Sequence, residues 1–216
     1  MKKFVGVLLA VLSAGSAWAG EMPGYTPPKP SAELEQVKAL EGRWKGESTE
    51  KGQEGQTINV QYHVTSGGSA VQETLDPGTS HEMVSIYHDV NGKLSMTHYC
   101  MLGNQPELEL KSAKDGKLVF EQSAASAETL KGQMAMGSLV LEHDKDTLTQ
   151  TWTSYDAGGK SMQSMPPTVF KLKKFDPAAA AVERRKKMAA AAAAAEKNAP
   201  KKEDKKEIKK DDKKKS

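Results

Sequence analysis

Hydrophobic and polar residues alternate along most of the chain between residues 43 and 174. This period of two is typical of β-strands with one buried and one solvated face. The clearest segment runs from Thr57 to Thr65, where apolar side chains occupy every second position. The other predicted strands are Arg43 to Glu50, Ser69 to Leu75, His81 to Asp89, Lys93 to Met101, Glu107 to Ser112, Lys117 to Gln122, Gly137 to His143, Thr147 to Tyr155 and Thr168 to Lys174. We therefore expect about ten strands.

Turn-forming residues separate these strands. Examples are Asp76-Pro77-Gly78, Asn91-Gly92 and Asp115-Gly116. Short strands joined by tight turns favour an antiparallel meander, closed into a barrel or folded as a sandwich, over a parallel α/β sheet. Residues 32–175 are expected to form this single domain, since about 140 residues suit one core. The stretch from Ser123 to Met136 fits neither the strand nor the helix period.

The pattern predicts helices at both ends of the domain. Ser31 can cap a short helix that runs to Leu40. Asp176-Pro177 followed by an alanine run predicts a second helix over 176–198. Residues 20–31 form a Pro- and Gly-rich leader, and residues 199–216, almost all Lys, Glu and Asp, cannot bury enough apolar surface to fold.

Residues 1–19 have the three parts of a secretory signal peptide. Lys2 and Lys3 precede a short apolar run, and Ala17-Trp18-Ala19 is a cleavage sequence. The apolar run is too short to span a bilayer. We therefore expect cleavage after Ala19 and a periplasmic or secreted monomer that does not span the membrane.

Formal net charge is +3, but the charge is unevenly distributed. Residues 176–216 carry +6 and the signal peptide +2, which leaves −5 for residues 20–175. The basic tail indicates either attachment to an anionic envelope polymer or a solvated spacer. Nucleic acid is not expected as a partner, because the tail lacks interleaved aromatic residues.

The hairpin from His81 to Met101 allows two strand registers. A three-residue loop would pair Asp89 with Lys93, whereas a two-residue Asn91-Gly92 loop shifts the pairing by one. The first register separates apolar from polar residues better, so it is preferred. It places six side chains on the inner face: Glu82, Val84, Ile86, Met96, His98 and Cys100.

The segment Gly42-Arg43-Trp44 resembles the first-strand signature of the lipocalin and fatty-acid-binding-protein (calycin) superfamily. In addition, His81-Glu82-Met83, Thr97-His98-Tyr99-Cys100 and Asn104-Gln105-Pro106 resemble a secreted bacterial family of that superfamily that has no settled activity. The resemblance covers about residues 35–174 and does not extend to the tail. It implies a lipocalin-like barrel whose closed end is filled by Trp44.

A barrel of this kind predicts a binding protein for a small hydrophobic or amphipathic ligand. The candidate ligand-binding residues are Glu82, Val84, Ile86, Met96, His98, Cys100, Asn104 and Gln105. Two alternatives remain open: a ligand-free envelope interaction module, and a metal or haem site that uses His98 and Cys100 with Glu82. No cofactor is expected, catalysis by Cys100 is disfavoured, and the methionines are interpreted as core filling.

Overall fold

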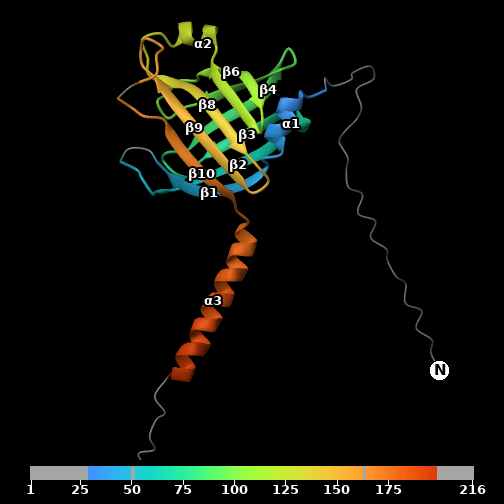
Figure 1. Ribbon diagram of the computed structural model, residues 1–216, viewed down its shortest axis with the longest axis vertical. Helices are drawn as coiled ribbons and strands as arrows, with labels where there is room; N and C mark the ends of the chain where they lie inside the picture. Colours follow the sequence, from blue (N-terminus) through green and yellow to red (C-terminus); the bar gives the residue numbers. More distant parts are fainter. Residues whose placement is uncertain (1–28, 50–51, 163, 199–216) are drawn as a thin grey trace, which may run out of the picture.

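The computed structural model describes residues 29–49, 52–162 and 164–198. Ten antiparallel strands form a closed barrel, in which each strand pairs with its neighbours in sequence and the last strand pairs with the first (Figure 1). The strands are β1 Gly42–Ser48, β2 Thr57–Thr65, β3 Ala70–Leu75, β4 Met83–Val90, β5 Lys93–Tyr99, β6 Glu107–Lys114, β7 Lys117–Gln122, β8 Ala135–His143, β9 Thr147–Tyr155 and β10 Thr168–Lys174. The predicted all-β barrel is confirmed.

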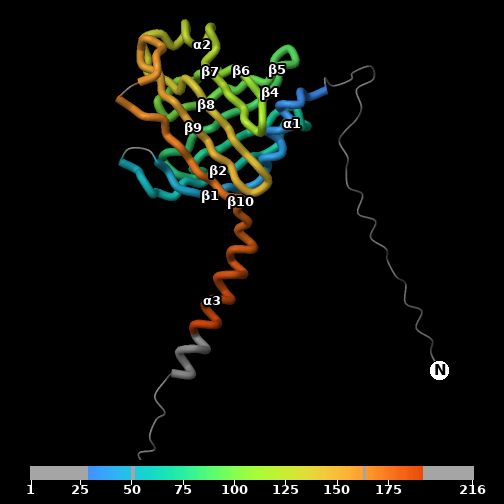
Figure 2. The backbone as a smooth tube through the Cα atoms, in the orientation of Figure 1, coloured from blue at the N-terminus to red at the C-terminus, as the bar shows by residue number. Residues whose placement is uncertain are grey.

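The helices lie before, between and after the strands of the barrel. The described residues contain α1 Ala32–Lys38, α2 Ala124–Thr129 and α3 Pro177–Asn198, besides a single 3-10 turn at Ser66–Gly68. Helix α2 lies in the stretch that fitted neither period, and Figure 2 shows α3 leading away from the barrel after β10. The described side chains of α3, at residues 177–191, are all exposed. No helix among the described residues is long and apolar enough to cross a membrane.

Three sequence predictions lie outside the described residues. They are the signal peptide (1–19), most of the leader (20–28) and the charged tail (199–216). Localisation and the anionic partner of the tail therefore stay predictions.

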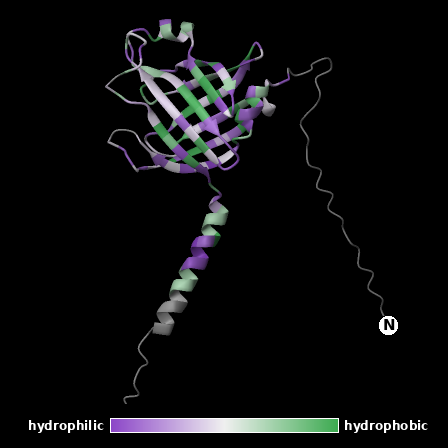
Figure 3. Cartoon of the chain, in the orientation of Figure 1, coloured by the Kyte–Doolittle hydropathy of each residue, from purple (hydrophilic) through white to green (hydrophobic). Residues whose placement is uncertain are grey.

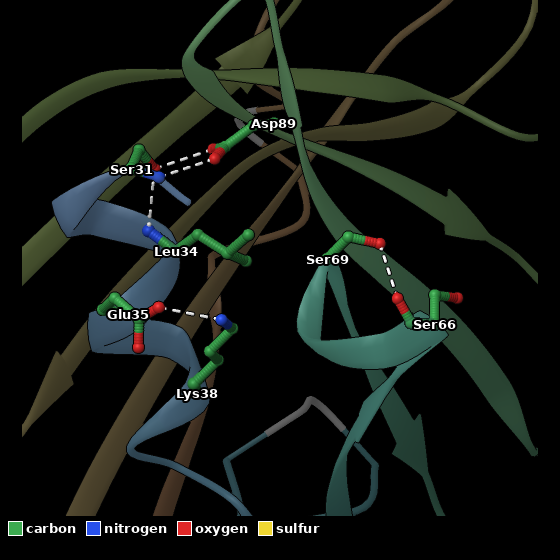
Figure 4. A network of polar contacts seen from close by, with 7 residues as sticks. All are labelled: Ser31, Leu34, Glu35, Lys38, Ser66, Ser69 and Asp89. Carbon is green, nitrogen blue, oxygen red and sulfur yellow. Dashed lines mark hydrogen bonds and ion pairs between the residues drawn. The ribbon is translucent and has the colours of Figure 1, made fainter. Parts of the chain in front are cut away.

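Helix α1 closes one end of the barrel. Ser31 caps it, because its Oγ accepts a hydrogen bond of 3.0 Å from the Leu34 backbone N–H. The Asp89 carboxylate accepts further bonds of 2.7 Å each from the Ser31 N–H and hydroxyl, which fixes the helix to β4 (Figure 4). Leu34 and Trp44 are both about 1% exposed and belong to one core cluster. Trp44 thus fills this end of the barrel.

Alternation of side chains also builds the core. Figure 3 shows hydrophobic and hydrophilic residues following one another along the barrel strands. Inward residues from all ten strands meet in one hydrophobic cluster or lie beside it. In the interior the Tyr87 ring packs against Tyr62 in a tilted arrangement and against Phe120 edge to face, with centroids 6.3 and 5.8 Å apart. The middle of the barrel is therefore filled by its own side chains.

The preferred register of the central hairpin is wrong. Val90 pairs with Lys93 and Ser85 with His98, so the loop has two residues, Asn91 and Gly92. Both have positive φ, 53° and 75°, as a type I′ turn requires. The physical reason for the error is that the barrel interior contains polar side chains, so separating polar from apolar residues selected the wrong face.

Candidate functional site

A pocket of about 300 Å³ opens at the end of the barrel opposite α1. We call it the mouth pocket. Its walls come from the ends of seven strands and from the loops between them. Ile58, Leu75, Trp152 and Phe170 supply buried apolar surface to it. This volume lies at the lower limit for small-molecule sites.

Sulfur-containing side chains line a large part of the mouth pocket. Five of the ten methionines of the chain reach it, and so does Cys100. The methionines are Met83, Met101, Met134, Met136 and Met165. Met96, by contrast, is fully buried in the core cluster. Met83 and Met136 also pack against the core cluster, as core filling predicts, whereas Met101, Met134 and Met165 are exposed, so core filling does not describe these three.

Below the mouth pocket lies a buried polar network centred on Glu73. This carboxyl group is 0% exposed. Its two oxygens accept hydrogen bonds of 2.5 Å from the Tyr87 hydroxyl and 2.6 Å from the Gln150 amide. The Gln150 amide also donates to the Tyr62 hydroxyl at 2.6 Å. Because polar groups are costly to bury unpaired, these mutual bonds allow a charged residue type inside the barrel.

Burial shifts the pKa values of this network. It raises the pKa of Glu73, although the hydrogen bonds from Tyr87, Gln150 and other partners oppose that shift. Burial and the neighbouring Glu73 raise the pKa values of Tyr62 and Tyr87 well above the usual tyrosine range. The two tyrosines are therefore neutral hydrogen-bond donors at physiological pH.

Trp152 separates this network from the mouth pocket. Trp152 lines the pocket, and its Nε1 donates a hydrogen bond of 3.4 Å to the Gln150 Oε1. Its ring also packs on the imidazole of His98, with centroids 4.9 Å apart. A ligand in the mouth pocket would contact the polar core through Trp152.

His98 is fully buried and neutral. Its Nδ1 lies 3.0 Å from the Ser85 hydroxyl, while its Nε2 has no hydrogen-bond partner among the described residues. Ser85 also bonds to Glu73 and lowers the pKa of that carboxyl group, so we assign the Ser85 proton to Glu73 and the imidazole proton to Nδ1. Burial lowers the pKa of His98 to about 4.

This lowered pKa predicts a loss of stability in acid. Unfolded His98 binds a proton below about pH 6.5, whereas folded His98 stays neutral down to about 4. The contribution of neutral His98 to stability is therefore complete above about pH 6.5 and is lost as the pH falls towards about 4. The loss amounts to about 3 kcal/mol of unfolding free energy. The free energy of unfolding, measured in urea at about pH 6.5 and about pH 4, should fall less for His98→Phe than for wild type.

The control for this prediction is His63→Phe. His63 is exposed on β2, so its replacement should leave the wild-type pH dependence unchanged. An equal fall in wild type and His98→Phe would contradict the assignment of acid sensitivity to His98.

Seven of the eight predicted site residues do not line the mouth pocket, and three of these seven do not face the barrel interior at all. Val84 pairs with Tyr99, which is 50% exposed, and Ile86 pairs with Thr97, so both point to the outer face of the barrel. Their predicted inward direction is wrong, for the reason given for the register. Glu82 precedes β4 and is exposed, where it accepts a hydrogen bond from the Gly78 N–H. It does not pair with Cys100.

The other predicted site residues are placed in three environments. Met96 and His98 do point inward but lie in the filled interior, below the pocket lining. Cys100 follows β5 and lines the mouth pocket. Asn104 and Gln105 lie in the β5–β6 turn, where their amides donate to the backbone carbonyls of Met134 and Gly103 respectively.

These positions bear on the metal and enzyme alternatives. His98 is enclosed in the core and Cys100 faces the mouth, so the structure does not bring the two into one site. The described residues hold no group of three or more His, Cys, Asp or Glu side chains suited to a metal ion. Burial also raises the pKa of the Cys100 thiol, whereas a nucleophilic cysteine needs a lowered one.

Sequence reasoning missed Glu73 and Trp152. One signal for Glu73 exists, because it is in phase with Val71 and Leu75, which both face inward. A charged residue in phase with apolar positions predicts a buried, partnered acid. For Trp152, the adjacent sequence, such as Thr151, contains no comparable signal that this residue lines a pocket.

Comparison with known proteins adds no function. A scan against protein-family models finds no match, and a search of curated proteins finds no significant one. The function is therefore inferred from the sequence and from the geometry of the barrel.

Proposed function

We propose that the mature protein is a periplasmic binding protein that holds a small hydrophobic or amphipathic ligand in the mouth pocket. The observation that carries this proposal is a mainly apolar pocket of about 300 Å³ at the open end of an otherwise filled barrel. The signal-peptide pattern of residues 1–19 supports the compartment. The Gly-x-Trp segment supports a place in the calycin superfamily.

The chemistry of the lining selects the ligand. The described lining residues include no Lys or Arg, and Asp76 is the one acidic residue among them. Its Oδ1 already accepts a hydrogen bond of 2.8 Å from the Asn59 N–H. An anionic ligand would therefore meet no Lys or Arg, and His81 is the one imidazole among the described lining residues. Hydroxyls such as those of Ser154 and Thr168 can orient one polar group of an amphipathic molecule.

The rim of the mouth pocket extends the apolar surface outward. Met101 is 57% exposed and Leu102 is 53% exposed, and both line the pocket. Exposed apolar side chains beside a cavity indicate a binding site rather than a simple core boundary. A ligand larger than the cavity could therefore leave its tail against these residues.

Thr168→Phe tests this function. Thr168 pairs with Trp152 across β10 and β9 and lines the mouth pocket, so a phenyl ring there fills the cavity. We expect the uncharged fluorescent probe N-phenyl-1-naphthylamine to bind the wild type, and the variant to bind at least about tenfold more weakly. Fluorescence titration of the probe measures both dissociation constants.

Thr149→Phe is the matched control, since Thr149 pairs with Lys171 on the outer face of the same strands. Its probe affinity should equal that of the wild type. Native mass spectrometry of protein from its own host should also show an added organic mass. Equal probe binding by all three proteins, with a clean apo mass, would overturn the proposal.

A further inference from the structure

The sulfur atoms at the mouth pocket come from four separate parts of the chain. Met83 begins β4, and Cys100 and Met101 lie in the β5–β6 turn. Met134 and Met136 flank the start of β8, while Met165 lies between β9 and β10. No regular spacing links them in the sequence, so the barrel topology alone brings them to one pocket.

Hydrogen bonds hold two of these segments together. The Asn104 side chain is 6% exposed, and its amide donates to the Met134 carbonyl at 2.9 Å. Within the turn, the Cys100 N–H donates to the Asn104 carbonyl at 3.1 Å. The Cys100–Met101 turn is therefore fixed against the Met134 segment. Asn104 is a positioning residue for this side of the pocket.

Donor type decides which ion suits the pocket. Thioether and thiolate sulfur are soft ligands that select copper(I), whereas hard divalent cations need oxygen. The lining also lacks Lys and Arg among the described residues, so no fixed positive charge there repels a cation. One thiolate with neutral thioethers would give copper(I) an uncharged complex, which an apolar pocket tolerates better than an ion.

We propose that the mouth pocket binds one copper(I) ion through the Cys100 thiolate and thioethers of the surrounding methionines. Methionine has three rotatable side-chain bonds, so several sulfur atoms lining one pocket of about 300 Å³ can reach a common ion. Binding replaces the S–H bond of Cys100 by a sulfur–copper bond and releases the proton to solvent. Copper stays in the +1 state throughout. This site does not depend on the proposed organic ligand.

The first test is an anaerobic titration of the mature protein with copper(I) in competition with bicinchoninate at pH 7. We expect one ion per chain and a dissociation constant below about 1 µM. The triple variant Met101→Leu, Met134→Leu and Met165→Leu keeps the apolar lining and removes three thioethers, and it should bind at least about tenfold more weakly. Met188→Leu, in the exposed part of α3, is the matched control and should bind as wild type does.

A second readout separates ligation from a structural effect. Silver(I) should shift the ¹³C-methyl resonances of the pocket methionines while those of Met96 and Met188 stay in place. In Cys100→Ser the release of one proton per copper(I) should disappear. Substoichiometric binding by the wild type, or equal affinity in the triple variant, would overturn the copper site.

The same variants distinguish this proposal from the binding function. Leucine preserves apolar volume, so the triple variant should still bind N-phenyl-1-naphthylamine. Failure of the probe to bind the wild type would overturn the organic ligand and leave the copper titration interpretable. If the wild type bound the probe but not copper(I), the copper site would be overturned and the proposed binding function would stand.

Discussion

Replacement of Glu73 by alanine is expected to lower the free energy of unfolding by about 3–5 kcal/mol. The carboxyl group is fully buried and accepts hydrogen bonds from Tyr87 and Gln150. Alanine leaves a cavity and removes the acceptor shared by the buried donors Tyr87, Gln150 and Ser85. Urea denaturation followed by far-UV circular dichroism measures the loss.

Glu73→Gln is the control that separates the effect of the carboxyl group from the effect of side-chain volume. Glutamine keeps the volume, and the Tyr87 hydroxyl can turn to accept from the new amide, so the expected loss is about 1–2 kcal/mol. Outer-face Glu47→Ala, on β1, should change stability by less than about 0.5 kcal/mol. Equal stabilities of Glu73→Ala and Glu47→Ala would contradict the role of the network.

The raised pKa of Glu73 also fixes the sign of a pH effect. The folded protein holds this proton more tightly than the unfolded chain, so the stabilising contribution is complete below about pH 4.5. It is lost as the pH rises through the folded pKa. The stability advantage of wild type over Glu73→Gln should therefore be greatest in acid and decrease towards neutral pH.

Periodicity and turn residues predicted an antiparallel meander, the resemblance to the calycin superfamily favoured a barrel over a sandwich, and neither predicted the interior. All ten predicted strands are present, because alternation reports directly on which side of a sheet faces solvent. The Asn91-Gly92 turn was also visible, and its type I′ chemistry indicates the observed register. The error came from assuming an apolar interior, since Ser85 and His98 face inward and Val84 faces out.

The candidate site could not be predicted because its members are distant in sequence. Glu73 and Gln150 are 77 positions apart and come from strands that do not pair. Likewise, Met83 and Met165 meet at the mouth pocket because of strand order, which a local pattern does not contain. Of the eight predicted ligand-binding residues, Cys100 is the one that lines this pocket. The motif resemblance singled out the β5–β6 turn but did not indicate that this turn borders the mouth pocket.

The closure of the barrel rests on a close approach at Gly46. This residue of β1 pairs with Leu172 of β10, the pairing that joins the first strand to the last. A Cβ atom at Gly46 would lie 1.8 Å from the Lys171 carbonyl oxygen and 2.7 Å from its carbon. Both are backbone atoms, so no side-chain rotation relieves the overlap.

Gly46→Ala is therefore expected to lower the free energy of unfolding by about 4 kcal/mol, because β1 and β10 must separate to admit the methyl group. Amide hydrogen exchange should show lost protection in these two strands before the rest of the barrel. Gly158→Ala is the matched control, since a Cβ there meets nothing closer than the Asp156 carboxylate at 3.2 Å. If Gly46→Ala retained wild-type stability and protection of β1 and β10, the strands would not be in close backbone contact, and the barrel would have to be held shut by side-chain packing instead.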